Sequence, residues 1–215
     1  GGGYPVSSAL VEQAISYHHV ISPSLASWMS NVQQIPSEKV VMAPLGGLTV
    51  QHADVSFRRR ELREPFTVAF VGRLARQKGP EVFLAAIRRL GQESTAMRFV
   101  MHGDGELAAW VERLIETAGL DAVIERRDSR SPVEDTLREA HLLVVSSHNE
   151  GLTLTTLEAI ALGVPVISTH VGAQADIIPQ RALVPRRSRA AARGLARLIS
   201  RLSANEVARE RLWTE

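Results

Sequence analysis

The feature that most constrains this chain is the regular alternation, from residue 65 onward, of short apolar runs with longer helical patterns. The runs lack a polar alternation, which is typical of strands buried on both faces of a sheet. They are TVAFVG (67–72), MRFVMH (97–102), AVIERR (122–127), HLLVVSS (141–147), VPVIST (164–169) and ALVP (182–185). Helical patterns lie between them, so the sequence predicts an α/β fold whose parallel sheet has helices on both faces.

The region before residue 65 is less regular. Short apolar runs at 18–24 and 40–43 predict two strands with a helix between them. Residues 51–65 are polar and rich in arginine, and we expect a linker there. The predicted organisation is therefore a first segment, residues 1–50, the linker, and a sheet domain over residues 66–215, which is long enough to bury a substantial core.

Two strand-to-helix loops carry residues that suit an anionic ligand. In open parallel sheets, ligands bind at the carboxyl ends of the strands, where these loops gather. GRLARQKG (72–79) offers glycines together with Arg73 and Lys78, whose charges suit phosphate oxygens. A solvated surface loop also explains this stretch when it is taken alone. SSHNEGLT (146–153) leads into a helix, whose free backbone amides favour an anion.

Two carboxylates flank the start of that helix. Glu150 lies in the loop, and Glu158 follows eight positions later. Glu158 shares one helical face with apolar residues, so it needs a partner if it is buried. Carboxylates accept charge-assisted hydrogen bonds from hydroxyls, so the pair suits a ribose or a hexose. The alternative is a half-exposed Glu158 and a Glu150 that only lies near the helix start.

Other chemistries have weaker support. The histidines that follow three strands, His102, His148 and His170, show no metal-binding spacing, and the chain has no cysteine, so we expect no metal site. Ser146 and Ser147 lack the GxSxG pattern of a hydrolase nucleophile. Metal-centre and hydrolase chemistry are therefore the less supported interpretations.

Arginines recur between residues 181 and 201, although the net charge is only +2. We interpret them as a solvated helix face. Nucleic acid or an anionic lipid is the alternative, but no aromatic residues are interleaved with the arginines, and we expect no nucleic-acid partner. No apolar run reaches the length of a membrane-spanning helix and no signal-peptide pattern is present, so we expect a cytoplasmic protein.

Taken together and in order, four stretches resemble the C-terminal, donor-binding domain of retaining glycosyltransferases of the GT-B fold, family 4. They are GRLARQKG, HGDGE (102–106), NEGLTLTTLEAIALGVPVIST (149–169) and VGAQADII (171–178). The specific element is E-x7-E, here Glu150 and Glu158. The resemblance covers residues 66 to about 200 and implies a Rossmann-like sheet, the C-terminal half of a GT-B fold. Residues 1–50 would then be the crossover segment and the tail of the N-terminal GT-B domain.

The resemblance implies a nucleotide-diphosphate sugar as donor, with UDP, GDP or ADP as the nucleotide. Arg73 and Lys78 would stabilise the departing diphosphate, and Glu150 would contact the sugar as the third catalytic residue. Glu158 would accept hydrogen bonds from the ribose. The other expected donor-binding residues are Gly72, Gly103, Asp104, Asp128, Gly151, Leu152, Thr153 and Leu154. No metal and no cofactor is expected, because cationic side chains and a helix dipole stabilise the leaving phosphate.

The family often has Gly or Pro where this chain has Thr153, and Gly-Gly-x-x-Glu where it has Gly172, Ala173 and Asp176. The expected acceptor is a carbohydrate or a glycolipid, with peripheral membrane contact in the full-length protein. Because the family places its acceptor site on an N-terminal domain, we expect this chain to be a piece of a longer enzyme and inactive alone. The alternatives are a non-catalytic nucleotide-sugar-binding module and a GT-B epimerase or phosphorylase.

Overall fold

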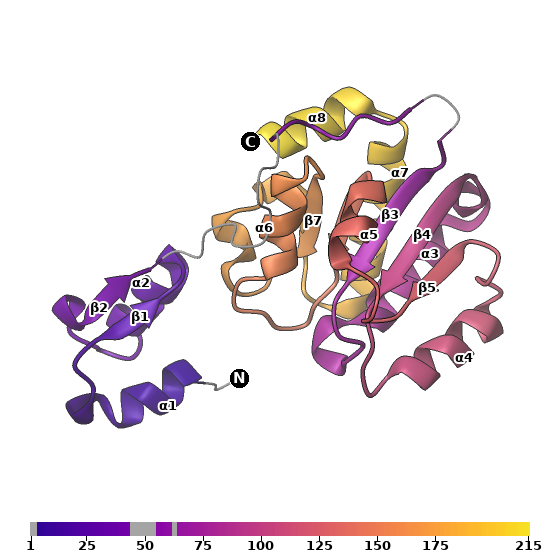
Figure 1. Cartoon of the computed structure of the whole chain (residues 1–215). Helices are drawn as coiled ribbons and strands as arrows, with labels where there is room; N and C mark the ends of the chain where they lie inside the picture. The colour runs from indigo at the N-terminus through magenta and orange to yellow at the C-terminus, as the bar shows by residue number, and fades with distance from the viewer. Residues whose placement is uncertain (1–3, 44–54, 62–63) are drawn as a thin grey trace. The chain divides into compact units, whose positions relative to one another are not determined.

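The computed structural model describes residues 4–43, 55–61 and 64–215, and the chain divides into two compact units, residues 1–48 and 49–215 (Figure 1). The smaller unit contains α1 (Tyr4–Leu10), β1 (His18–Val20), α2 (Pro23–Asn31) and β2 (Val40–Met42). Its two strands are parallel, and Val20, Met29 and Ile35 form its core. Both predicted strands and the helix between them are confirmed.

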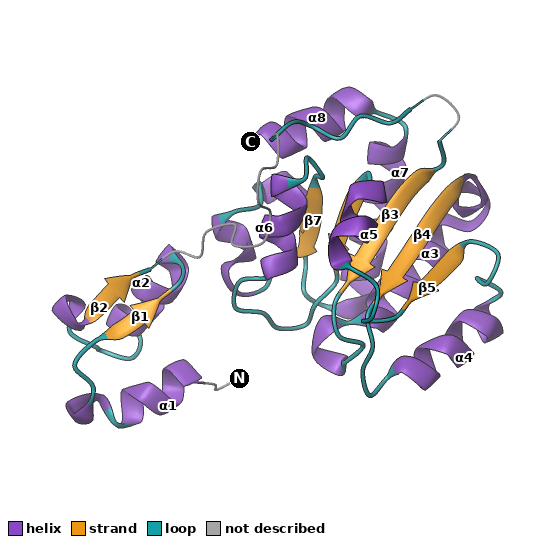
Figure 2. Cartoon of the chain, viewed as in Figure 1, coloured by secondary structure: helices purple, strands orange, loops and turns teal. Residues whose placement is uncertain are grey.

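The larger unit is built on a six-stranded sheet, drawn in orange in Figure 2. Its strands are β3 (Phe66–Val71), β4 (Met97–His102), β5 (Ile124–Arg127), β6 (Leu142–Val145), β7 (Val166–Thr169) and β8 (Leu183–Val184). They lie in the order β5-β4-β3-β6-β7-β8, and every neighbouring pair is parallel. The predicted parallel α/β sheet is therefore confirmed, with the strand order of a Rossmann fold.

Helices cover both faces of this sheet. They are α3 (Pro80–Leu90), α4 (Ala108–Ala118), α5 (Val133–Glu139), α6 (Leu154–Ala161), α7 (Ser188–Ser203) and α8 (Glu206–Thr214). In Figure 1, α5 and α6 lie in front of the strands, and α3 and α7 lie behind them. Short 3-10 helices span Glu12–Ala14, Ser37–Lys39, Arg76–Lys78, Gly91–Ala96, Gly172–Asp176 and Gln180–Ala182. Helix α4 begins at Ala108, and the amide of Leu107 donates to the carbonyl of Leu74, which holds the preceding turn against the first loop.

The core lies between the sheet and these helices. Phe83 of α3 packs between Phe70 of β3 and Phe99 of β4, with ring centroids 5.6 and 6.2 Å apart. Burial of such side chains stabilises the fold by roughly 1.5 to 3 kcal/mol each. Helix α3 buries its apolar side and leaves Arg88 and Arg89 exposed, as its amphipathic sequence requires.

The described part of the predicted linker is packed on the sheet domain. The amide of Arg58 donates to the carbonyl of Gly163 at 2.8 Å, and its side chain reaches the carbonyl of Arg138. Gly163 has a φ of +79°, and a Cβ there would lie 1.9 Å from the carbonyl oxygen of Ser56, so only glycine allows this approach. Residues 51–54 and 62–63 lie outside the described residues. In the part of the chain that the structure describes, no helix is both long and apolar enough to cross a membrane.

Candidate functional site

The strand order reverses between β3 and β6, and the loops that follow these two strands are the ones singled out from the sequence. A crevice at such a switch point, outside the carboxyl ends of the strands, is where open α/β sheets bind ligands. The loops 72–79 and 146–153 are therefore neighbours, although they are more than 60 residues apart in the chain.

Gly79 brings the two loops into contact. Its φ is +61°, and an added Cβ would lie 2.3 Å from the carbonyl oxygen of Ser146. The hydroxyl of Ser146 donates to the carbonyl of Gly79 at 2.9 Å, and the amide of His148 donates to the carbonyl of Gln77 at 2.8 Å. Pro80 then begins α3 with a φ suited to the first helical position.

An ion pair joins the two loops at the centre of the site. The Lys78 ammonium donates to Oε1 of Glu150 at 2.7 Å, and the Ser147 hydroxyl donates to the same oxygen at 2.6 Å. The Glu150 side chain is 6% exposed and that of Lys78 is 23% exposed, so the carboxylate is enclosed and the cation is partly exposed to solvent. Arg73, in the same loop, is exposed and has no acidic partner among the described residues. Two of the three predicted catalytic residues, Lys78 and Glu150, are thus in contact, and the third, Arg73, is exposed to solvent.

Gly151 and Gly172 have different surroundings within the protein. A Cβ on Gly151 would meet nothing within 4 Å, so the fold leaves open space at this predicted donor-binding residue. Gly172, in the 3-10 helix Gly172–Asp176, has a φ of +53°, and a Cβ there would lie 2.0 Å from the carbonyl oxygen of Glu150. The amide of Ala173 donates to the carbonyl of Gly151 at 2.9 Å. The close backbone approach within the protein therefore occurs at Gly172.

At the helix after Gly151, the structure agrees with the alternative of a half-exposed Glu158. Helix α6 buries Thr156 and Ala159 against the sheet. Leu154 is 48% exposed and Glu158 is half-buried, so the apolar stripe is not the most buried face of the helix. Thr156 and Ala159, rather than the leucines, mark the buried face. The Glu158 side chain is therefore partly exposed to solvent.

Thr153, the predicted donor residue that differs from the family pattern, has its side chain engaged within the protein. The buried Gln174 donates from its amide nitrogen to the Thr153 hydroxyl. The Thr156 hydroxyl donates to the other end of the Gln174 amide at 3.3 Å. Gln174 thus fixes the segment 172–176 to the first turn of α6. Leu152, another predicted donor residue, is partly exposed beside it.

Three further predicted residues lie at the ends of β4 and β5. Gly103 has a φ of +132°, and a Cβ on it would lie 2.2 Å from the carbonyl oxygen of Gly72. Asp104 accepts hydrogen bonds from the hydroxyl and amide of Ser129 at 2.6 and 2.8 Å, and these hydrogen bonds lower the pKa of Asp104. Hydrogen bonds from Arg130 lower the pKa of Asp128. Both carboxylates are therefore ionised at neutral pH and occupied by local donors.

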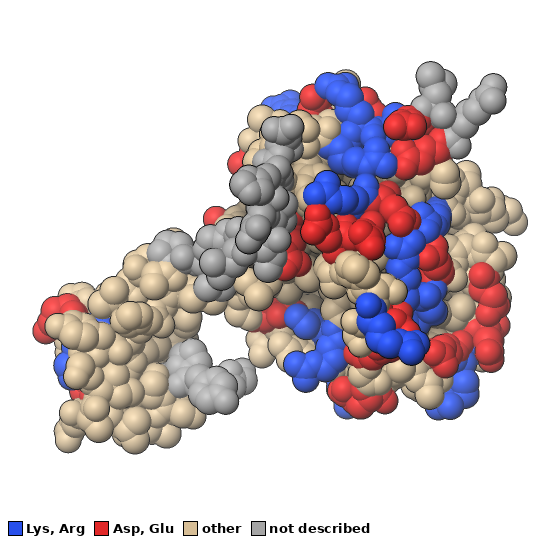
Figure 3. Space-filling model, viewed as in Figure 1, with Lys and Arg blue, Asp and Glu red and all other residues tan. Residues whose placement is uncertain are grey.

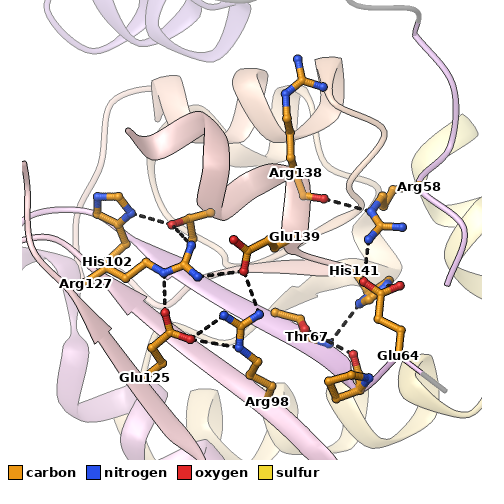
Figure 4. Close-up of polar contacts among 12 residues, drawn as sticks. Arg58, Glu64, Thr67, Arg98, His102, Glu125, Arg127, Arg138, Glu139 and His141 are labelled. Carbon is orange, nitrogen blue, oxygen red and sulfur yellow. Dashed lines mark hydrogen bonds and ion pairs between the residues drawn. The ribbon is translucent and has the colours of Figure 1, made fainter. Parts of the chain in front are cut away.

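A network of ion pairs lies on the sheet beside these loops (Figure 4). Arg98 and Arg127 each pair with both Glu125 and Glu139, at N–O distances between 2.5 and 2.8 Å. The hydrogen bond to Glu139 raises the pKa of Arg127. Two cations and two anions balance, so the network fastens α5 to β4 and β5 and presents no surplus charge to a ligand.

The three histidines considered for a metal do not come together. His102 is buried with Nδ1 2.7 Å from the Thr136 hydroxyl, and burial lowers the pKa of its imidazole. His148 lies with Nε2 2.5 Å from Glu81 of α3, and His170 is exposed. Within residues 4–43, 55–61 and 64–215, no three metal-ligating side chains are grouped to hold an ion.

Sequence reasoning missed Ser147, Glu81 and Gln174 as residues that position the site. Ser147 had been considered only as a nucleophile, and its contact with Glu150 requires the turn between them. Glu81 and Gln174 contact the 146–153 loop from α3 and from the segment after β7. Their spacing from the loop carries no local signal, so only tertiary packing reveals them.

Comparison with known proteins adds family relatives. Alpha-D-kanosaminyltransferase of Streptomyces kanamyceticus is 32% identical over 152 residues, 66% of this chain and 39% of its own length. D-inositol 3-phosphate glycosyltransferase of Corynebacterium jeikeium is 36% identical over 126 residues, 53% of this chain and 30% of its own. The chain therefore spans between 30% and 39% of the length of these two relatives.

Solved structures share the fold. The pneumococcal O-GlcNAc transferase GtfA, in complex with UDP and GlcNAc, matches 99% of this chain and 43% of its own with a TM-score of 0.80 and 18% identity. Anabaena HepE, in complex with UDP and glucose, matches 97% of this chain and 59% of its own with a TM-score of 0.77 and 16% identity. At these identities the likeness shows the fold alone, which is that of GT-B glycosyltransferases.

The sequence profile described as "Glycosyl transferases group 1" matches residues 65–203, which is most of the sheet domain and includes all four motif stretches. With this match over more than half of its length, the chain belongs to the glycosyl transferases group 1 family.

Proposed function

We propose that this chain is the C-terminal, donor-binding portion of a retaining glycosyltransferase that transfers a hexosyl group from a nucleotide-diphosphate sugar to a carbohydrate or lipid acceptor. The observation that carries the proposal is the contact between Lys78 and Glu150 across the switch point of the sheet. It places a cation for phosphate and a carboxylate for sugar hydroxyls side by side, at the edge where the amides of α6 begin.

The proposed roles follow from exposure and charge. Arg73 is exposed and Lys78 is partly exposed, so both side chains can contact the diphosphate. Glu150 then accepts hydrogen bonds from the donor sugar, and Glu158, which is partly exposed on α6, accepts them from the ribose. Backbone amides at the start of the same helix and in the loop before it approach the ligand, and they include those of Gly151, Leu152 and Leu154.

The reaction that fits these groups is electrostatic. The bond between the anomeric carbon and the phosphate oxygen breaks, and the acceptor hydroxyl attacks from the face that the phosphate leaves. Its proton passes to the departing phosphate oxygen. Arg73, Lys78 and the amino end of α6 stabilise the charge that develops on the diphosphate. The proposal includes neither a metal nor a cofactor.

Calorimetry with UDP, GDP and ADP tests the donor site. UDP comes first, because GtfA and HepE of the same fold were solved with UDP. We expect one nucleotide to bind with a stoichiometry of about one. The absence of heat with all three at millimolar concentration would sink the proposal for this chain.

Glu158→Gln tests the ribose role. The side chain keeps its shape and loses its charge, so we expect UDP affinity to fall by roughly tenfold while the unfolding curve is unchanged. The matched control is Glu134→Gln on α5, which lies outside the loops of the site. Equal affinities of the two variants would contradict the assignment of Glu158.

Catalysis itself is tested with the longer polypeptide that contains this chain. We expect it to transfer sugar or to hydrolyse the donor slowly, with the anomeric configuration retained in the product, as read by NMR. Donor binding without either reaction would favour a non-catalytic module, and an inverted product would contradict retention.

A further inference from the structure

An open cavity of about 600 Å³ is lined by residues of α3, α4 and α7. It is lined by Glu81, Leu84, Ala85, Arg88, Arg89, Leu114, Ala118, Leu120 and Arg189. Apolar side chains of α3 and α4 supply its floor. None of the predicted catalytic or donor-binding residues lines it, so the proposed transferase function leaves it unexplained.

Three arginines surround this apolar floor. Arg88 and Arg89 come from the last turns of α3, and Arg189 comes from the first turn of α7. Among the described residues, none of them has a carboxylate within ion-pair distance. Glu81 is the acidic residue of the lining, and it lies 2.5 Å from Nε2 of His148. The cavity therefore combines an apolar surface with positive charge that the protein does not neutralise.

The positive charge continues along α7. Arg193 and Arg197 follow Arg189 at intervals of four residues, which is one exposed side of the helix. The opposite side buries Ala191, Ala192, Leu195, Ala196, Ile199 and Leu202. Helix α7 contains no acidic residue. We call Arg88, Arg89, Arg189, Arg193 and Arg197 the arginine face.

The arginine face differs from the rest of the molecule. Its five charges exceed the net charge of +2 of the whole chain, so the remaining residues are acidic in sum. On the sheet domain, the face drawn in Figure 3 intermixes acidic and basic side chains. The ion pairs of that domain, such as Arg98 with Glu125, involve other arginines. The arginines concentrated on α3 and α7, which lack ion-pair partners among the described residues, favour an anionic partner.

We propose that the arginine face binds the surface of a bilayer that contains anionic phospholipid, with lipid phosphates on the arginines and hydrocarbon against the floor of the cavity. Arginine is the side chain best suited to phosphate, and each basic residue near such a surface adds to the attraction. The apolar floor favours hydrocarbon over a single-stranded nucleic acid, whose bases stack on aromatic side chains, because the lining contains none. The proposal does not depend on the donor-binding residues, none of which lines the cavity.

Sedimentation with vesicles tests this surface. The 215-residue chain is mixed with vesicles of phosphatidylcholine alone, or of phosphatidylcholine with phosphatidylglycerol, at low and at high salt. We expect binding to the anionic vesicles only, weakened by salt because the charges are exposed. The triple variant Arg88→Gln, Arg89→Gln, Arg189→Gln should bind at least about tenfold more weakly. Equal binding to both kinds of vesicle, or an unaffected triple variant, would overturn the proposal.

A control variant separates position from net charge. Arg130, Arg138 and Arg211 pair with Asp128, Glu134 and Glu215 on their own segments. Replacing these three by Gln removes the same charge from outside the arginine face, and we expect vesicle binding to stay within about twofold of the unmodified chain. A loss as large as that of the first triple variant would show that only net charge matters and would refute the site.

Ala85 tests the cavity itself. It lines the cavity and is exposed, so a larger side chain there does not disturb the core. Ala85→Glu puts a carboxylate on the floor and should weaken vesicle binding several-fold more than Ala85→Gln, with both variants folded by circular dichroism. Calorimetry with inorganic phosphate and with a short RNA completes the test. Binding of either one that competes equally with vesicles and is insensitive to Ala85→Glu would assign the surface to that ligand and overturn the lipid proposal.

Discussion

The two ends of strand β6 hold a carboxylate in opposite ways. At the amino end, Glu64 meets His141, which is completely buried. At the carboxyl end, Glu150 forms an ion pair with Lys78, which is partly exposed. Both contacts join segments more than 70 residues apart. The two contacts differ in whether the protein itself supplies a partner for every polar atom of the pair.

At the amino end, the protein satisfies His141 on all sides (Figure 4). The amide of Thr67 donates to Nδ1 of His141 at 3.0 Å, so the proton is on Nε2, which donates to Glu64 at 3.2 Å. The ring stacks on Phe66, whose other contact is the buried guanidinium of Arg209, 5.1 Å from the ring centroid. Burial lowers the pKa of His141 to about 4, so its imidazole is neutral at physiological pH.

At the carboxyl end, the cation is not enclosed. Lys78 makes one ion pair and is 23% exposed, and Arg73 beside it has no acidic partner among the described residues. A ligand phosphate can therefore replace or join Glu150 without first unfolding the loop. Polar groups at the closed end therefore contribute to stability, whereas on the proposed function those at the open end are available for binding.

Gly172→Ala should have the largest effect. Both the positive φ and the 2.0 Å approach of the new Cβ to the Glu150 carbonyl oppose any side chain, so we expect a loss of at least about 3 kcal/mol in urea unfolding. The matched control is Gly151→Ala, whose Cβ meets nothing within 4 Å and should leave stability within about 0.5 kcal/mol. Equal stability of the two variants would show that the 172–176 segment does not rest on the loop.

Acidification should have the next largest effect, at the closed end. The folded pKa of His141 is about 4 and its ordinary value is 6.5, so the unfolded chain binds the proton more readily between these values. Its contribution of about 3 kcal/mol is present above pH 6.5 and is lost as the pH falls towards 4. Urea unfolding at several pH values measures this slope.

His141→Gln is the control for that slope, because it removes the titrating group and keeps polar atoms near Thr67 and Glu64. We expect a flatter pH dependence in the variant, whatever its stability at pH 7. The NMR titration of His141 in the unmodified chain gives a second measurement. A midpoint near 6.5 would contradict the closed-end description.

Lys78→Met should have the smallest effect on stability and a large one on binding. Lys78 is partly exposed and Ser147 still donates to the enclosed carboxylate, so the free energy of unfolding should fall by about 1 to 2 kcal/mol, less than in the two cases above. Affinity for a nucleoside diphosphate should fall by roughly tenfold or more, because a phosphate loses a charged donor. Lys78→Arg should retain most of the affinity. A variant that is destabilised by several kcal/mol and still binds normally would reverse the contrast between the two ends.

The fold and much of the site follow from local sequence patterns. Apolar runs of four to six residues predict the strands, and the loops after β3 and β6 contain Lys78 and Glu150. The helical stripe at Leu154 and Glu158 leaves open whether Glu158 is buried, and the structure buries Thr156 and Ala159 of α6 instead. Donor identity, retention, the acceptor and a cytoplasmic location stay predictions.

Local sequence patterns predict the alternation of strands and helices and the positions of the charged loops, because these properties depend on residues that are neighbours in the chain. Three contacts depend on the tertiary structure: the ion pair of Lys78 with Glu150, the hydrogen bond of Gln174 to Thr153, and the close backbone contact at Gly172 rather than at Gly151. These contacts join residues up to 72 positions apart, and they depend on the order in which the strands pair. Local periodicity is the same for many strand orders, whereas side-chain packing and hydrogen bonding select one.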